Sequence, residues 1–326
     1  YRHYIAECKE KLAALEQEEM TLEKMNQRYT WEAMIIAMEA IIDFAHRYAD
    51  LAEKTAAACA DEKRKAELLT MAHDCRVVPE NPPQTFRQVL QLVLLTHCAI
   101  MIENNGYHHP IGRLDQYLYP FYKKALAEGQ SEEYLTDLIH EFKLRFEEMW
   151  YLRSAGEAEA YPGCALYMHI VLGGMKPDGT DACNDLTRLI LRGMEDLQTK
   201  EPCISFRFHE DVDEETFRLA MKIALNGDSH PAFFNDGANV TSLQELGFSL
   251  EEARDYSLVG CTEAIVAGKS DYQSNTGFFN TLKVFELALN DGRDPVTGKQ
   301  IGPHTGDART FTSLEELKKG QDFILQ

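Results

Sequence analysis

The chain has 326 residues, of which 44% are hydrophobic and 26% are charged. This is a globular composition, and the length allows one large domain or two of ordinary size. The 53 acidic side chains exceed the 33 basic ones, which gives a net charge of −20 at pH 7. Such a surface argues against nucleic acid and anionic membranes as partners, because both select basic faces.

Neither a membrane span nor a secretory leader is predicted. The longest apolar stretch, residues 93–102, has about ten residues, whereas a membrane span needs about 20. The chain does not open on a basic start followed by an apolar run. Its 8 cysteines include no C-x-x-C pair and are too sparse for a disulfide scaffold. We therefore expect a reduced, cytoplasmic protein whose thiols are mostly small buried hydrophobes.

The first part of the chain has helical patterns. Residues 1–24 are rich in Glu, Lys and Leu and contain no Gly or Pro, which predicts a helix. Over 31–48 apolar residues recur every three or four positions, as in an amphipathic helix. A third helix is predicted over 61–75, and a proline-rich segment then ends it. Thr85 is placed to cap a long apolar helix that runs to about Glu103.

The second half alternates between strand and helix patterns. Strands are predicted at 165–174, 203–210, 232–236 and 256–261, and helices at 182–197, 214–226 and 249–255. This alternation favours a βα architecture with a mostly parallel sheet. We expect one compact α/β unit, with a mostly helical layer over 1–105 and a strand-and-helix portion over 106–326.

Most familiar catalytic and cofactor-binding motifs are absent from the sequence. It has no G-x-G-x-x-G, no H-E-x-x-H and no G-x-S-x-G. The segment GRDPVTGKQ resembles a phosphate-binding loop, but its glycines are one residue too far apart and Gln300 stands where Ser or Thr would bind magnesium. His108 and His109 are adjacent and would point to opposite faces of a strand, so no metal site is predicted.

One segment carries candidate chemistry, YSLVGCTEAIVAGKSDY at 256–272. An apolar strand ends at Gly260, and Cys261, Thr262 and Glu263 follow. A thiol and a carboxylate two residues apart can face one cavity if the loop is extended. Gly260 lets the backbone approach a neighbour closely.

This segment and several others resemble the glycyl radical enzymes, the pyruvate formate-lyase-like superfamily. The matching segments are GCTE at 260–263, CRVVPENPPQTFRQVLQ at 75–91, ENNGYHHPIGRLDQYLYPFY at 103–122, PAFFND at 231–236, FFNTLKVFELALNDG at 278–292 and IGPHTGD at 301–307. The likeness covers the chain from about residue 29 to residue 309. Several motifs at compatible spacing make it a specific match.

The resemblance implies an α/β fold, part of a ten-stranded barrel with helices outside and the cysteine loop in the interior. It implies that Cys261 forms a transient thiyl radical that takes a hydrogen atom from substrate, and that Glu263 is a general acid/base. The family's radical glycine lies in a downstream R-V-x-G-like motif that this sequence lacks. We therefore expect a single-domain fragment over 1–326, without the C-terminal glycyl radical domain and with no cofactor bound in the chain itself.

The resemblance also suggests a substrate pocket. Tyr107 and His108 occupy positions where related dehydratases often have His-Ser, and Ser274 and Phe278 match pocket positions downstream of the cysteine. Phe206 and Phe234 end predicted strands and could wall the cavity, although aromatic residues at strand ends are more often core. Arg113 and Asp115 are expected to form a structural pair.

The activity implied by the resemblance is a radical carbon–oxygen lyase, a dehydratase of a small metabolite such as a diol or a hydroxyproline-like compound. Formate acetyltransferases have a second cysteine next to the first, and Thr262 is not one. Formate acetyltransferase and arylacetate decarboxylase remain the alternative activities, and an inactive binding protein that keeps the fold is the alternative of a different class. The implied partners are a small-molecule substrate, a radical-SAM activating enzyme and a second copy in a homodimer.

Overall fold

The protein was analysed as a computed structural model of the whole chain, which describes all residues except 105–108, 150–151, 161–165, 228–229, 271–279 and 326. The chain divides into two compact units, Tyr1–Tyr272 and Gln273–Gln326. In the first unit the helices are α1 (Arg2–Leu15), α2 (Leu22–Ala58), α3 (Glu62–Val77), α4 (Phe86–Asn104), α5 (Leu114–Tyr117), α6 (Tyr119–Ala127), α7 (Glu132–Glu147), α8 (Ala155–Ala160), α9 (Asp185–Asp196), α10 (Glu214–Ala224), α11 (Asp236–Glu245) and α12 (Leu250–Arg254). Its strands are β1 (Ile170–Gly173), β2 (Ile204–Phe208), β3 (Ala232–Asn235), β4 (Ser257–Val259) and β5 (Glu263–Ile265).

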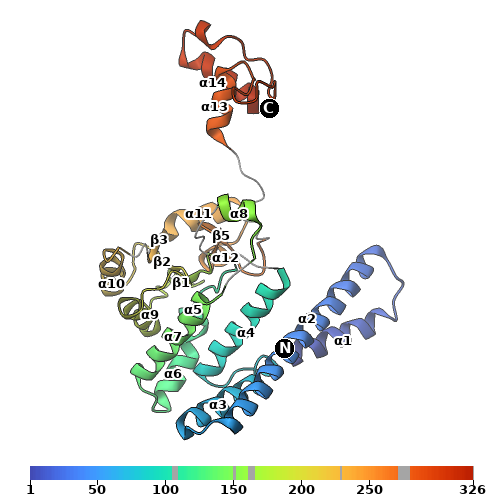
Figure 1. Cartoon of the computed structure of the whole chain (residues 1–326), viewed down its shortest axis with the longest axis vertical. Helices are drawn as coiled ribbons and strands as arrows, with labels where there is room; N and C mark the ends of the chain where they lie inside the picture. The colour runs from blue at the N-terminus through green and yellow to red at the C-terminus, as the bar shows by residue number, and fades with distance from the viewer. Residues whose placement is uncertain (105–108, 150–151, 161–165, 228–229, 271–279, 326) are drawn as a thin grey trace. The chain divides into compact units, whose positions relative to one another are not determined.

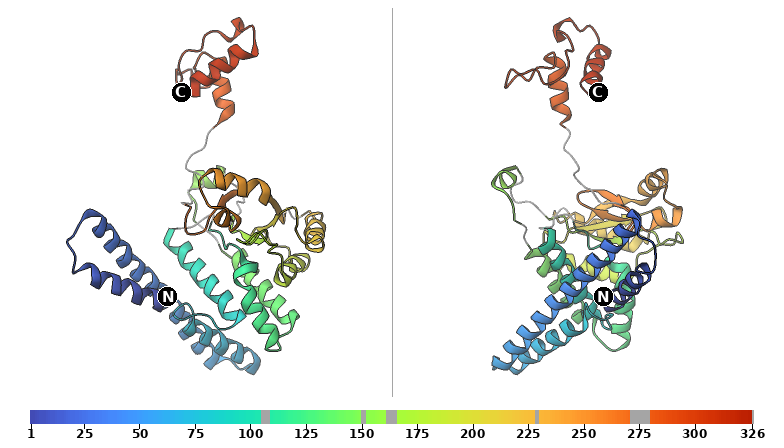
Figure 2. Two further views of the ribbon diagram at one scale, coloured as in Figure 1. Left: turned by 180° about the vertical axis from the view of Figure 1, so that it is seen from behind. Right: turned by 90° about the vertical axis from the view of Figure 1, so that its right-hand side faces the viewer.

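The N-terminal helices follow the predicted pattern with one correction. The helix predicted over 1–24 is interrupted, because α1 ends at Leu15 and α2 begins at Leu22. The interruption has a local cause: the Thr21 hydroxyl accepts a hydrogen bond from the Lys24 amide and starts a new helix. Figure 2 shows α2 running as one long helix beside α1. Ile5 and Met38 pack in the apolar cluster that joins the two helices.

The apolar helix α4 begins where Thr85 predicts it. The Thr85 hydroxyl accepts a hydrogen bond from the Gln88 amide. By length and composition alone, its residues Phe86–Glu103 are apolar enough to cross a membrane, although the sequence contains no uninterrupted apolar run of that length. In this structure the helix packs through Phe86, Val89 and Leu90 into the largest apolar cluster of the protein.

The centre of the first unit is a parallel three-stranded sheet in the order β1-β2-β3 (Figure 1). Alternation divides β2 between two faces, as a strand requires. Ile204 and Phe206 belong to the large apolar cluster that also contains residues of α4, α9 and α10. Ser205 and Arg207 lie on the opposite face, beside Val171 of β1, which packs in a second cluster with residues of α11, α12 and β4.

The sheet corrects two expectations from sequence. The described residues form an open three-stranded parallel sheet, so they do not show the expected ten-stranded barrel. The strand predicted at 256–261 does not join that sheet. Its residues form β4, which pairs antiparallel with β5 in a hairpin, with Val259 opposite Glu263. Alternating hydrophobicity predicts a strand but not its partner, because the same pattern fits a strand of the parallel sheet and a strand of an antiparallel hairpin.

The second unit contains α13 (Thr281–Leu289), a short 3-10 helix (Ala308–Thr310) and α14 (Leu314–Leu325). The GRDPVTGKQ segment is a tight turn here. The Asp294 carboxylate is bonded by the Lys283 ammonium and by Thr297, and the Gly298 amide donates to the Asp294 carbonyl. Asp294 thus holds the turn together through its side chain and its backbone carbonyl. This structural role agrees with the prediction that the segment is not a phosphate-binding loop.

Candidate functional site

The site is built on the β4–β5 hairpin, whose turn carries the candidate cysteine. Gly260, Cys261 and Thr262 connect the paired residues Val259 and Glu263. Gly260 is buried and has a φ of +59°, in the left-handed region that glycine adopts without strain. The side chains of Cys261 and Glu263 are both exposed, so the turn presents a thiol and a carboxylate together on one hairpin tip.

The exposure of Cys261 differs from the expected interior position. A loop is enclosed only when a barrel closes around it, and the described strands form an open sheet and a separate hairpin. Within this chain the thiol is therefore open to solvent.

A histidine holds the backbone immediately before the cysteine. His169, which precedes β1, is 3% exposed, and its Nε2 lies 2.5 Å from the Gly260 carbonyl oxygen. Its Nδ1 lies 2.9 Å from the hydroxyl of Ser205, which is fully buried in β2. Sequence reasoning did not select either residue. The available signal was a polar residue inside an apolar strand pattern, which is unusual unless the residue has a buried partner.

A buried ion pair holds the start of β4. The Arg207 guanidinium donates to both carboxylate oxygens of Asp236 at 2.9 Å, and both side chains are fully buried. Arg207 also donates to the carbonyls of Arg254 and Tyr256, at 2.7 and 2.6 Å. The Tyr256 hydroxyl donates to Asp236 at 2.8 Å. Bidentate geometry and additional hydrogen bonds from the guanidinium are the conditions under which a buried pair is stable.

The position of Arg207 in this ion pair also explains why residue 174 is a glycine. Gly174, just after β1, has a φ of +79°, and a Cβ placed there would lie 2.6 Å from Arg207 Nε. The guanidinium therefore occupies the space that any side chain at position 174 would need.

A second thiol lies close to the turn. Cys203, at the entrance to β2, is buried, and its pKa is raised by burial, by the nearby Glu201 carboxyl and by Cys261. Burial also raises the pKa of Glu201, which accepts hydrogen bonds from the amides of Tyr167 and Met168. Glu201 thus fixes the segment that leads into His169, and Cys203 is held as a neutral thiol.

The remaining predicted site residues divide into three groups. Tyr107, His108, Ser274 and Phe278 lie outside the described residues. Phe206 is fully buried in the large apolar cluster, on the sheet face opposite Ser205, where it packs as a core residue; its assignment to the pocket stays a prediction. Phe234 of β3 is half-buried against the second apolar cluster.

Arg113 and Asp115 are structural, but they do not form the direct pair that was expected. Arg113 bonds Asp255 at 2.5 Å and the carbonyls of Gly173 and Met175. Asp115 is fully buried and accepts from the Gly173 amide and the Thr187 hydroxyl, and burial raises its pKa. Both residues therefore brace the end of β1.

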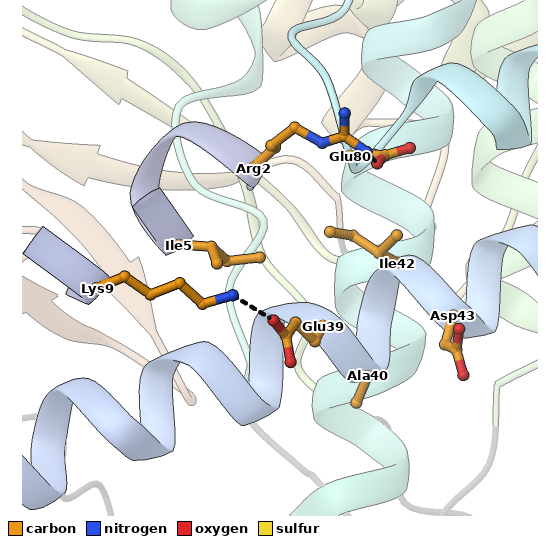
Figure 3. A pocket seen from close by; sticks show the side chains of 8 residues that line it. All are labelled: Arg2, Ile5, Lys9, Glu39, Ala40, Ile42, Asp43 and Glu80. Carbon is orange, nitrogen blue, oxygen red and sulfur yellow. Dashed lines mark hydrogen bonds and ion pairs between the residues drawn. The ribbon is translucent and has the colours of Figure 1, made fainter. Parts of the chain in front are cut away.

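A groove of about 560 Å³ lies between α1 and α2, far along the sequence from the hairpin (Figure 3). Four of its charged side chains are already paired, Lys9 with Glu39 at 3.0 Å and Arg2 with Glu80. It contains none of the predicted site residues. Across the described part of the chain, no group of three or more His, Cys, Asp or Glu side chains could hold a metal ion.

The comparisons with known proteins agree with the motifs. Residues 1–323 match the family described as pyruvate formate lyase-like. The chain is 35% identical over 299 residues to (2S)-3-sulfopropanediol dehydratase of Klebsiella oxytoca, with 91% of this chain and 36% of the relative covered. It is 36% identical over 323 residues to isethionate sulfite-lyase of Bilophila wadsworthia, with 95% and 38% covered.

The fold also matches a solved structure, the glycerol-bound B12-independent glycerol dehydratase from Clostridium butyricum. The TM-score is 0.93 at 29% identity, over 99% of this chain and 40% of that one. The chain thus spans about two-fifths of the length of the relatives it matches.

Proposed function

The chain belongs to the pyruvate formate lyase-like family of glycyl radical enzymes, and from this membership we propose that it carries the thiyl cysteine and the acid/base of a radical dehydratase. The observation that carries the proposal is the hairpin tip, where Cys261 and Glu263 are presented together by the turn at Gly260. The proposed activity is the elimination of water from a small hydroxylated metabolite. The dehydratases among the relatives support this choice.

In the proposed reaction the Cys261 thiyl takes a hydrogen atom from a substrate carbon, which forms the S–H bond and leaves a carbon radical. Glu263 then moves a proton from the hydroxyl on the radical carbon to the neighbouring hydroxyl, which departs as water. The product radical takes the hydrogen atom back from the thiol. Hydrogen atoms and electrons balance over the cycle, and no external oxidant or reductant is consumed.

The radical itself is proposed to reside on a glycyl residue in a C-terminal segment that the described residues do not contain. When present it takes the hydrogen atom from the Cys261 thiol at the start of a cycle. The exposed position of Cys261 supports this arrangement, because a separate loop must reach the sulfur. A radical-SAM activating enzyme, a homodimer and a cytoplasmic location complete the proposal.

Elimination of sulfite is the second candidate reaction. The observation that favours it is the relative at 36% identity, an isethionate sulfite-lyase. The hairpin serves both reactions equally, since each begins with hydrogen abstraction beside a leaving group. The choice between them therefore depends on substrate.

The test is turnover by the activated, intact enzyme with glycerol, 1,2-propanediol, trans-4-hydroxy-L-proline, 3-sulfopropanediol and isethionate. Cys261→Ser should abolish turnover with the fold retained, because an O–H bond is too strong for a glycyl radical to break. Glu263→Gln is nearly isosteric but cannot exchange protons, so turnover should fall at least about a hundredfold. The glycyl radical signal in electron paramagnetic resonance should persist in both variants.

Two matched controls accompany these variants. Cys59→Ser changes a half-buried thiol at the end of α2, and Glu251→Gln changes an exposed carboxylate in the first turn of α12. Both should keep wild-type turnover. If Glu263→Gln also keeps it, Glu263 is structural and the dehydratase proposal loses its main support.

A further inference from the structure

The carbonyl of the peptide bond that joins Gly260 to Cys261 is held by the side chain of His169, the residue just before β1. The His169 Nε2 lies 2.5 Å from the Gly260 carbonyl oxygen, although the two residues are 91 positions apart in sequence. Both residues are buried. The contact therefore connects the entrance of β1 directly to the residue preceding the thiol.

Gly260 needs such a contact more than another residue would. At a φ of +59° it lies in the left-handed region, and without a side chain it can leave this region at little steric cost. The orientation of its carbonyl fixes the plane of the following peptide, and that plane carries the Cys261 Cα. A hydrogen bond to this carbonyl supplies the restraint that glycine lacks.

The histidine is itself fixed in position and in tautomer. A carbonyl oxygen only accepts, so Nε2 carries the proton in this contact, and in the neutral ring Nδ1 accepts from the Ser205 hydroxyl at 2.9 Å. The His169 carbonyl accepts from the amides of Ile111 and Gly112, at 2.8 and 3.1 Å. The ring therefore has a defined donor direction on a rigid part of the fold.

We propose that His169, oriented by Ser205, is a positioning residue that sets the direction of the Cys261 thiol through the Gly260 carbonyl. Its kinetic consequence rests on the proposed function, since hydrogen transfer depends on the distance between the sulfur and the substrate carbon. A misplacement of about 1 Å from a distant substitution costs about a hundredfold in rate. The structural consequence, restraint of the hairpin by His169, does not depend on any activity.

The structural test is hydrogen–deuterium exchange on this chain, followed by mass spectrometry of peptides that cover 257–265. His169→Phe keeps a ring and removes the donor, so exchange in the hairpin should rise about fivefold or more, as expected for loss of a buried hydrogen bond. Peptides that cover β1 and β2 should keep their protection. His169→Gln places an amide donor within reach and should restore most of the hairpin's protection.

A matched control exists in the same unit. His140 of α7 also contacts a glycine carbonyl, that of Gly193, at 3.1 Å, and α7 packs on α9 in the large apolar cluster. His140→Phe should leave hairpin exchange unchanged. If His169→Phe raises hydrogen exchange throughout the first unit, the milder variant Ser205→Ala provides the test. Faster exchange of Ser205→Ala confined to the hairpin supports the proposal, and unchanged exchange in the hairpin overturns it.

The kinetic test uses the activated enzyme. His169→Phe should lower kcat by about a hundredfold, with KM and radical content near the wild type, and should increase the isotope effect of a substrate deuterated at the abstracted hydrogen. His169→Gln should recover most of the rate. A wild type that carries the radical but turns over none of the substrates refutes the proposed function and leaves the exchange result standing. The positioning role is overturned if His169→Phe leaves hydrogen exchange in the hairpin unchanged. It is also overturned if His169→Gln does not restore the rate that His169→Phe loses.

Discussion

Replacing Asp236 with Asn tests whether the buried ion pair holds the cysteine hairpin on the sheet. The substitution keeps the shape of the side chain and removes the charge that Arg207 faces. Arg207 and Asp236 are both fully buried, so water cannot compensate for the lost charge. Removing one partner of a buried pair costs about 3–5 kcal/mol, a large share of the roughly 5–15 kcal/mol that stabilises a typical domain.

The assay is urea unfolding at pH 7, followed by far-ultraviolet circular dichroism. At a slope of about 1–3 kcal/mol/M, the midpoint should fall by about 1 M or more. Glu214→Gln is the matched control, because it removes the carboxylate of an ion pair with Arg218 in which both side chains are 76% exposed. Its effect should lie within the error of measurement, since water screens exposed pairs.

A double variant distinguishes charge from shape. Arg207→Met combined with Asp236→Leu removes both charges and should recover part of the loss, because apolar residues of similar volume can replace a buried pair. Recovery should be incomplete, since the carbonyls of Arg254 and Tyr256 lose their donor. An Asp236→Asn midpoint equal to that of the control would refute the reasoning.

The remaining predictions concern a glycine and a histidine. Gly174→Ala should lower the melting temperature more than Gly129→Ala, because both have a positive φ but only the Cβ at 174 meets Arg207, at 2.6 Å. Burial, and to a lesser extent His109, lowers the pKa of His97 from 6.5 to about 4. A lowered histidine pKa means that stability is complete above pH 6.5 and falls as the pH drops toward 4, by about 3 kcal/mol. His97→Gln should remove that part of the pH dependence, as measured by urea midpoints from pH 7 to pH 4.

Local signals in the sequence predict much of the fold. The capping hydroxyl of Thr85 and the apolar periodicity over 31–48 both reflect interactions between residues a few positions apart. The helices that they predict are confirmed as α4 and α2. The alternation of strands and helices likewise predicts a mostly parallel sheet, and β1, β2 and β3 form one. These features depend on neighbours in the chain, which a sequence displays directly.

The parts that sequence did not predict depend on distant partners. His169 meets Gly260 across 91 positions, and Arg207 meets Tyr256 across 49. A polar residue inside an apolar strand pattern indicates that a buried partner exists, but nothing near either residue identifies that partner. Phe206 shows the same limit, because alternation places it on one face of β2 but does not reveal whether a cavity or a helix covers that face.

The attachment of the hairpin has a consequence for how sequence changes can move its tip. β4 and β5 form their own two-stranded ladder. Side chains hold the backbone beside them: Arg207 of β2 bonds the Arg254 and Tyr256 carbonyls before β4, and His169, just before β1, contacts the Gly260 carbonyl in the turn. Strands within one ladder share their register, so a shift in one disturbs the next. A loop tethered by side chains can instead be moved by single substitutions that leave the sheet intact. The hairpin tip is therefore separable from its scaffold, and its position can change through substitutions at these contacts while the parallel sheet stays the same.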